Sequence, residues 1–163
     1  MIGQQEVFDR LKQLNISFTY TEHPEAPTIE IGRQYWAKLP GTHCKNLFFR
    51  NHKGNKHYLV IFQCDQNLAI HDLEQLLHQG KLSFASEQRM EKYLGLRPGS
   101  VSPFGLINDT EHHVFVFLDE NLKKYTHLSF HPNDNRASLN ISLLDFIKYM
   151  DSTCNEYTWI KLY

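Results

Sequence analysis

Residues 45–62 read Lys-Asn-Leu-Phe-Phe-Arg-Asn-His-Lys-Gly-Asn-Lys-His-Tyr-Leu-Val-Ile-Phe. Two largely apolar runs, at 45–50 and 58–62, flank a polar segment at 51–56. Gly54 and Asn55 in that segment supply the positive φ angles that a tight turn requires. The stretch therefore predicts a β-hairpin, and the rest of the fold has to be arranged around it.

Helices and strands are expected on both sides of the hairpin. The expected helices cover 2–14, 28–36, 70–78, 86–94 and 142–150, and the expected strands cover 17–21, 82–85, 114–118, 125–130, 139–141 and 157–160. Two prolines in 23–27 predict a loop there. Because a helix does not follow every strand, the pattern favours an α/β fold with a mixed sheet surrounded by helices over a doubly wound parallel sheet.

Composition limits the class of protein. The chain has 163 residues, of which 41% are hydrophobic and 21% are charged. These values fit one globular domain spanning 1–163, which we expect to be a monomer. Three cysteines without a CxxC motif argue against a disulfide framework and fit a reduced, cytoplasmic compartment. We find neither a signal-peptide pattern nor an apolar run of transmembrane length, so we expect no membrane association.

The net charge of −1 conceals an uneven distribution. No acidic residue lies between positions 31 and 64, whereas the rest of the chain carries 11 basic and 18 acidic residues. The six bases of this basic segment are Arg33, Lys38, Lys45, Arg50, Lys53 and Lys56. The global charge excludes a protein that coats nucleic acid broadly, but the basic segment allows a local contact with phosphates.

The ten histidines show no metal-binding spacing, and neither HExxH nor a zinc-finger pattern is present. His43 and Cys44 are adjacent, so on a strand their side chains diverge and do not form a nucleophile–base pair. We therefore expect no metal and no thiol chemistry, with most histidines at the surface or half-buried. His131 is the exception, because it begins a turn just before Pro132, where a pocket rim could lie.

Two further features have both a structural and a functional interpretation. Lys45, at the start of an apolar strand, is either an edge lysine that discourages aggregation or a cation that contacts a phosphate at a pocket mouth. The segment 95–105, with three glycines and two prolines, is either a rigid connector or a binding loop built from its backbone. No carboxylate has the apolar flanks that would raise its pKa for catalysis.

These features together resemble the YbaK/prolyl-tRNA-synthetase-associated domain family of aminoacyl-tRNA editing hydrolases. The resemblance covers nearly the whole chain and is most specific where Lys45 is combined with the GxxxP element at 99–103. The other matching stretches are Tyr20 to Pro24, Cys44 to Phe48, Phe84 to Glu87, Leu94 to Leu106 and Phe130 to Asn133. It is closest to the free-standing members that deacylate Ala-tRNA(Pro).

The resemblance implies an α/β fold with a mixed, barrel-like sheet and a site without metal or other cofactor. It implies that Lys45 is the essential residue and contacts the terminal nucleotide of tRNA(Pro), and that the GxxxP backbone recognises the aminoacyl group. The residues expected to bind substrate are Asn46, Gly99, Ser100, Val101, Ser102, Pro103, Gly105 and His131. The acceptor stem is expected to be steered by Arg50, Lys53 and Lys56.

The chemistry suits these residues, because an aminoacyl ester is already activated and can be cleaved by positioned water with help from the ribose hydroxyl of the substrate. A proline pocket cannot strongly reject the smaller alanine, so a second, smaller sieve is needed, with His131 as part of its wall. Alternatives remain: a deacylase for cysteine or serine, a noncatalytic module that binds tRNA or a synthetase, or a metal-dependent hydrolase. The resemblance also allows prolyl-tRNA synthetase as a partner.

Overall fold

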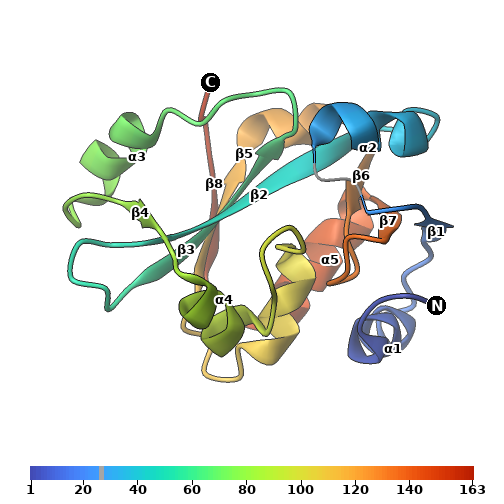
Figure 1. Cartoon of the computed structure of the whole chain (residues 1–163), viewed down its shortest axis with the longest axis horizontal. Helices are drawn as coiled ribbons and strands as arrows, with labels where there is room; N and C mark the ends of the chain where they lie inside the picture. Colours follow the sequence, from blue (N-terminus) through green and yellow to red (C-terminus); the bar gives the residue numbers. More distant parts are fainter. Residues whose placement is uncertain (26–27) are drawn as a thin grey trace.

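The computed structural model describes residues 1–25 and 28–163 (Figure 1). The loop expected at 23–27 therefore falls partly on Ala26 and Pro27, which lie outside the described residues. The strands are β1 (Thr19–Glu22), β2 (Thr42–Arg50), β3 (His57–Gln63), β4 (Ser83–Phe84), β5 (Phe115–Asp119), β6 (His127–Phe130), β7 (Ala137–Ser142) and β8 (Tyr157–Ile160). The helices are α1 (Gln5–Gln13), α2 (Ile29–Trp36), α3 (Ile70–Leu77), α4 (Glu87–Leu94) and α5 (Leu143–Thr153), with 3₁₀ turns η1 (Pro103–Asn108) and η2 (Glu120–Lys124).

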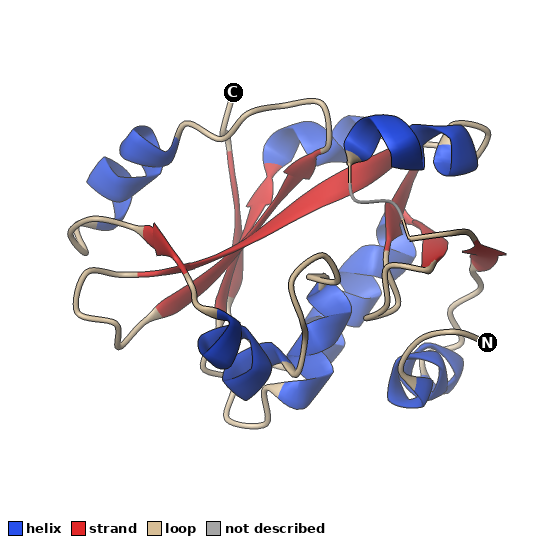
Figure 2. Cartoon of the chain, in the orientation of Figure 1, coloured by secondary structure: helices blue, strands red, loops and turns tan. Residues whose placement is uncertain are grey.

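The strands form one mixed sheet in the order β1-β7-β6-β2-β3-β5-β8, with β4 added to β2. The pairs β2–β6, β3–β5 and β5–β8 are parallel and the others are antiparallel. Helices surround this sheet (Figure 2). The α/β fold with a mixed sheet surrounded by helices, expected from the sequence, is confirmed.

The predicted hairpin lies at the centre of the sheet. Register pairs Lys45 with Phe62 and Arg50 with His57, and Gly54 in the turn has φ of +71°. Leu59 and Ile61 face a core shared with α1, α4 and α5, whereas Val60 and its neighbours on the other face join a second core with α3. A strand buried on both faces needs a continuous apolar run, which is what 58–62 provides.

Side-chain caps fix where three of the helices begin. The hydroxyls of Thr28, Ser86 and Ser142 accept hydrogen bonds from the backbone N–H three residues later, at the starts of α2, α4 and α5. Each cap was expected from the sequence. The segment 95–105 is a loop as expected up to residue 102, but its last three residues enter η1, where Phe104 packs edge-on against Phe130 and Tyr149.

Candidate active site

A gap in strand pairing creates the site. One edge of β2 pairs with β6 at Thr42 and His43 and with β4 at Phe49 and Arg50. In the part of the chain that the structure describes, no strand pairs with residues 44–47 on that edge. The carbonyl of Phe48 points outward there to accept from Ala85 N at 2.9 Å. The backbone of Asn46, two residues earlier, therefore points outward as well, towards an opening without a partner strand.

A cavity of about 380 Å³ occupies this opening. Five residues predicted for the site line it: Lys45 and Asn46 from β2, Gly99 and Val101 from the segment 95–105, and His131 from the turn after β6. These residues are up to 86 positions apart in the chain, and the fold brings them around one hollow.

The Lys45 ammonium lies at the cavity, where its direct contacts are a backbone carbonyl and an aromatic ring. Its Nζ donates to the carbonyl of Gln66 at 3.4 Å and lies 5.7 Å from the centre of the Phe62 ring. Among the described residues Lys45 forms no ion pair with a carboxylate. Its charge is therefore available to an anion that enters the cavity.

Asn46 holds an unused acceptor at the same wall. Its Nδ2 donates weakly to the Cys44 carbonyl at 3.4 Å, and its buried Oδ1 has no hydrogen-bond partner among the described residues. A buried acceptor without a donor costs stability, which is acceptable where a ligand supplies the donor.

Gly99 is where the 95–105 segment meets the turn that follows β6. Its φ is +85°, and a Cβ added there would lie 3.3 Å from Nδ2 of Asn135, which also lines the cavity. Asn135 in turn donates to Glu25 at 2.7 Å. Glycine at position 99 thus provides both the backbone conformation and the close approach of the two loops.

Three histidines and Trp36 form an aromatic wall. His43 stacks on Trp36 with ring centroids 3.9 Å apart, and its ring lies 5.4 Å from that of His131. His131 lies 6.0 Å from His23, which stacks on Tyr35. The sequence singled out His131 but not Trp36 or His43, because a tryptophan at a helix end and a histidine on a buried strand carry no pattern that separates site from core.

His43 and His131 are the neutral histidines that face the cavity. Burial, followed by the neighbouring histidines, lowers the pKa of His43 to about 3. Burial also lowers the pKa of His131. Nδ1 of His131 donates to the Ala137 carbonyl at 2.8 Å, which leaves Nε2 as the acceptor of that ring. Nδ1 of His43 is buried without a partner among the described residues.

The cavity offers neither a carboxylate nor a thiolate. No aspartate or glutamate is among its described lining residues. Cys44 and Cys64 do line it, but burial raises the pKa of both thiols, so both are protonated at neutral pH. Within residues 1–25 and 28–163, no group of three His, Cys, Asp or Glu side chains is arranged to hold a metal ion. The wall can position and polarise a substrate, but it supplies no strong protein nucleophile.

Four residues predicted to bind substrate lie outside this lining. Ser100 follows Gly99 but does not reach the hollow, and Ser102 is fully buried, where its hydroxyl caps η1. The Pro103 carbonyl accepts from Tyr149 at 2.9 Å, and a Cβ on Gly105 would lie 2.7 Å from Leu96. In this structure these three hold the loop against the core, because the chain turns inward after Val101.

The bases predicted to steer the acceptor stem lie at the far end of the hairpin. Arg50 ends β2, five residues from Lys45, or about 17 Å along an extended strand. Its guanidinium donates to the carbonyls of Asn51 and His52. Lys53 lies in the turn, and Lys56 lines a different cavity. The basic segment therefore covers two separate regions instead of one patch around Lys45.

Comparison with known proteins now adds to this geometry. The profile of the aminoacyl-tRNA editing domain family matches residues 23–149. The chain belongs to this family. It is thus an enzyme of the aminoacyl-tRNA deacylase class. The editing-domain match includes every residue that lines the cavity.

Relatives of this editing domain extend along nearly the whole chain. This protein is 39% identical over 162 residues to the prolyl-tRNA editing protein ProX of Acetoanaerobium sticklandii, and the alignment covers 99% of both chains. It is 34% identical to prolyl-tRNA synthetase associated domain-containing protein 1 of Danio rerio, covering 92% of this chain and 82% of that one. A crystal structure of a putative trans-editing enzyme for prolyl-tRNA synthetase shares the fold, with a TM-score of 0.73, 19% identity and coverage of 96% and 95%. None of the described helices of the editing domain is long and apolar enough to cross a membrane.

Proposed function

We propose that this protein is a free-standing trans-editing deacylase that hydrolyses the ester of mischarged tRNA(Pro), with Ala-tRNA(Pro) as its substrate. The observation that carries the proposal is the convergence of Lys45, Asn46, Gly99, Val101 and His131 on one cavity. The naming of a 39% identical relative as a prolyl-tRNA editing protein supports tRNA(Pro) as the RNA.

Lys45 is proposed to bind the phosphate of the 3′-terminal nucleotide. An ammonium that lacks a carboxylate partner at a cavity mouth suits a phosphate, because it supplies a compact charge and three donors. This contact would fix the terminal ribose relative to the aminoacyl group, and thus the ester relative to the cavity wall.

The aminoacyl group is proposed to lie between the 99–103 backbone and β2. Asn46 Oδ1 and His131 are both acceptors in their present hydrogen-bonding states. Two acceptors suit the α-ammonium group, which can only donate. Because the His131 ring is neutral, it does not repel that ammonium.

The reaction proposed is addition of water to the ester carbonyl, followed by departure of the ribose oxygen, which takes up a proton. The products are free alanine and tRNA with an intact 3′ end. The cavity provides no carboxylate or thiolate, so we assign activation of the water to the vicinal ribose hydroxyl of the substrate. Positioning and fixed backbone dipoles supply the rest of the acceleration.

Selection of alanine over proline is proposed to rest on the size of the hollow. Trp36, His43 and His131 form a packed wall that cannot easily yield, since each ring contacts another. A smaller second sieve of this kind removes alanine that a proline pocket cannot reject. We propose further that the protein acts as a cytosolic monomer, with Arg50, Lys53 and Lys56 attracting the RNA.

The experiment that tests this proposal is a deacylation panel with tRNA(Pro) carrying alanine, cysteine, serine or proline, assayed with and without EDTA. We expect alanine to be released fastest, proline to be spared and EDTA to have no effect. If cysteine or serine is released faster than alanine, the substrate is tRNA(Pro) charged with that amino acid instead of Ala-tRNA(Pro). Binding of tRNA without cleavage of any ester would leave only a noncatalytic module, and loss of activity in EDTA would point to a metal-dependent hydrolase.

A further inference from the structure

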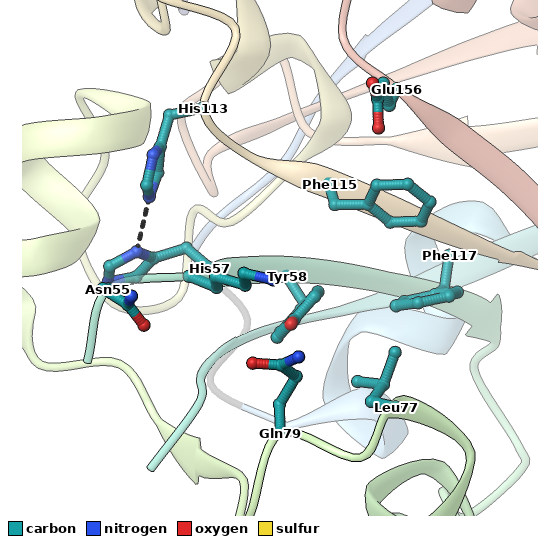
Figure 3. Close-up of a pocket in the computed structure, with 10 residues that line it drawn as sticks. Asn55, His57, Tyr58, Leu77, Gln79, His113, Phe115, Phe117 and Glu156 are labelled. Carbon is teal, nitrogen blue, oxygen red and sulfur yellow. Dashed lines mark hydrogen bonds between the residues drawn. The ribbon is translucent and has the colours of Figure 1, made fainter. Parts of the chain in front are cut away.

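A second cavity, of about 440 Å³, lies at the turn end of the hairpin, away from Lys45 (Figure 3). Tyr58 in its wall is four residues along β3 from Phe62, the partner of Lys45, so the two hollows are about 13 Å apart along the strand. Of the residues that line it, the proposed deacylation uses only Lys56, as one of the bases that attract the RNA, and it gives the hollow itself no role.

Aromatic rings form one wall of the second cavity. The rings of Phe115 and Phe117 are 4.9 Å apart, and that of Tyr58 is 5.8 Å from Phe117. Phe117 is nearly buried, whereas Phe115 is partly exposed to the hollow. Such a wall suits a flat aromatic ring, because stacking on aromatic side chains does not depend on the identity of that ring.

The adjoining wall is held rigid by hydrogen bonds and stacking. Arg89 can only donate, and its Nη1 lies 3.0 Å from Nε2 of His57. The proton of His57 is therefore on Nδ1, which donates to His113 at 2.9 Å (Figure 3). Tyr93 stacks on His113 with centroids 4.5 Å apart. His113 thus keeps its own Nδ1–H as a donor.

Asn51 orients two amide groups at the cavity. It is almost fully buried, and its Nδ2 donates to Oδ1 of Asn55 at 2.7 Å and to Oε1 of Gln79 at 3.4 Å. Because both oxygens face Asn51, the Nδ2 of Asn55 and the Nε2 of Gln79 are left as donors. The hydroxyl of Tyr58 also has no hydrogen-bond partner within the described ranges.

The rim of the second cavity carries a basic residue at one part, Lys56, and an acidic residue at another, Glu156. Lys56 lies beside Asn55 on the hairpin, and Arg50 and Lys53 are close to it in the chain. Glu156, an exposed residue just before β8, lies beyond Phe115 (Figure 3). A ligand that fits therefore has an aromatic ring, several acceptors, an anionic group near Lys56 and a donor near Glu156.

We propose that this second cavity binds a nucleotide, with the base on Phe115 and Phe117, the phosphate at Lys56 and the exocyclic amine of the base at Glu156. The same chemistry is available from a free mononucleotide and from an unpaired nucleotide of an RNA strand. The Glu156 carboxylate favours adenine, guanine and cytosine over uracil, which has no exocyclic amine.

Isothermal titration of AMP, CMP, GMP and UMP tests the site. We expect UMP to bind weakest, and Lys56→Ala and Phe115→Leu each to weaken AMP about tenfold. Lys53→Ala is the matched control, since it removes a lysine from the same turn without touching the hollow and should leave AMP affinity unchanged. Glu156→Gln should reduce the difference in affinity between CMP and UMP.

A five-nucleotide single-stranded RNA distinguishes the two sources. If the protein binds the RNA more tightly than AMP, and Lys53→Ala lowers the affinity for the RNA but not for AMP, the occupant is a nucleotide of an RNA strand. Equal affinities for the RNA and AMP indicate a free nucleotide. The proposal is overturned if no nucleotide or RNA binds at millimolar concentration, or if Lys56→Ala and Lys53→Ala act alike on AMP. Deacylation by Phe115→Leu, measured in parallel, tests the proposed function separately, because that residue lies outside the Lys45 cavity.

Discussion

The imidazole of His43 lies flat on the indole of Trp36, with ring centroids 3.9 Å apart and an interplanar angle of 9°. This stack forms part of the wall of the Lys45 cavity. The indole of Trp36 also packs closely against the backbone of its own helix at Gly32. A Cβ on Gly32 would lie 1.8 Å from the indole Cη2, so the absence of a side chain at position 32 makes room for the ring.

Gly32→Ala should therefore damage the protein, although alanine normally stabilises a helix interior by about 1 kcal/mol over glycine. Because Trp36 must move, we expect the free energy of unfolding to fall by about 1–3 kcal/mol and the selectivity for alanine over proline to decrease. Urea denaturation and the deacylation panel measure both effects. Gln34→Ala, on the exposed side of the same helix, is the control; a stabilised, fully selective Gly32→Ala would refute the role given to the stack.

Gly99→Ala should impair the site more than the fold. The positive φ of Gly99 strains any other residue, at a cost of about 1–3 kcal/mol, and the added methyl presses on Asn135 at the cavity rim. We expect kcat/KM for Ala-tRNA(Pro) to fall about tenfold. Gly80→Ala is matched, since Gly80 has φ of +75° but lies away from the hollow; equal activity in the two variants would contradict this expectation.

The stability of the fold should decrease as pH drops from about 6.5 to 4. In the unfolded chain the imidazole of His43 takes up a proton near pH 6.5, whereas in the folded chain its pKa is about 3 and it stays neutral. Between these two pKa values the unfolded state binds more protons than the folded state. Each pH unit of acidification therefore lowers the free energy of unfolding by about 1.4 kcal/mol for this group. His57, with a pKa of about 4, acts in the same direction.

Urea denaturation at several pH values measures that slope. His43→Phe keeps a ring against Trp36 but cannot titrate, so its stability should depend less on pH than that of the wild type. His52→Gln, at an exposed histidine, is the control for replacement of an imidazole away from Trp36. Parallel slopes for wild type and His43→Phe would show that His43 is not held neutral by the fold.

Thiol reactivity should divide the cysteines. Cys154 is exposed, whereas Cys44 and Cys64 are buried and their pKa values are raised by burial. A thiol-specific reagent should modify one cysteine quickly in the native protein and all three after unfolding. Cys154→Ser should abolish the fast phase; rapid modification of Cys44 or Cys64 in that variant would reveal a reactive thiol at the site.

The sequence predicts most of the secondary structure because periodicity and caps are local. The hairpin at 45–62 and the caps at Thr28, Ser86 and Ser142 depend on neighbouring residues only, and all are present. The turn of 103–108 into η1 was missed because it depends on Phe104 reaching a core formed by α5 and β6.

Only some of the residues around the Lys45 cavity could be predicted from the sequence. Lys45 and Gly99 could be singled out by combination with a family pattern, and they do lie around one cavity. Trp36 and His43 could not, since their role depends on a stack between a helix and a strand. The charge of the basic segment was visible, but its division between the two ends of β2 follows from strand length.

The most direct test of the central claim is the single-turnover rate of Ala-tRNA(Pro) hydrolysis by wild type and Lys45→Ala, with Lys81→Ala as a control at an exposed lysine outside the cavity. If Lys45 fixes the terminal phosphate, its loss should slow hydrolysis by about 100-fold or more, equivalent to about 2.7 kcal/mol, with the melting temperature unchanged. Lys81→Ala should match wild type. Equal rates for wild type and Lys45→Ala would contradict the account.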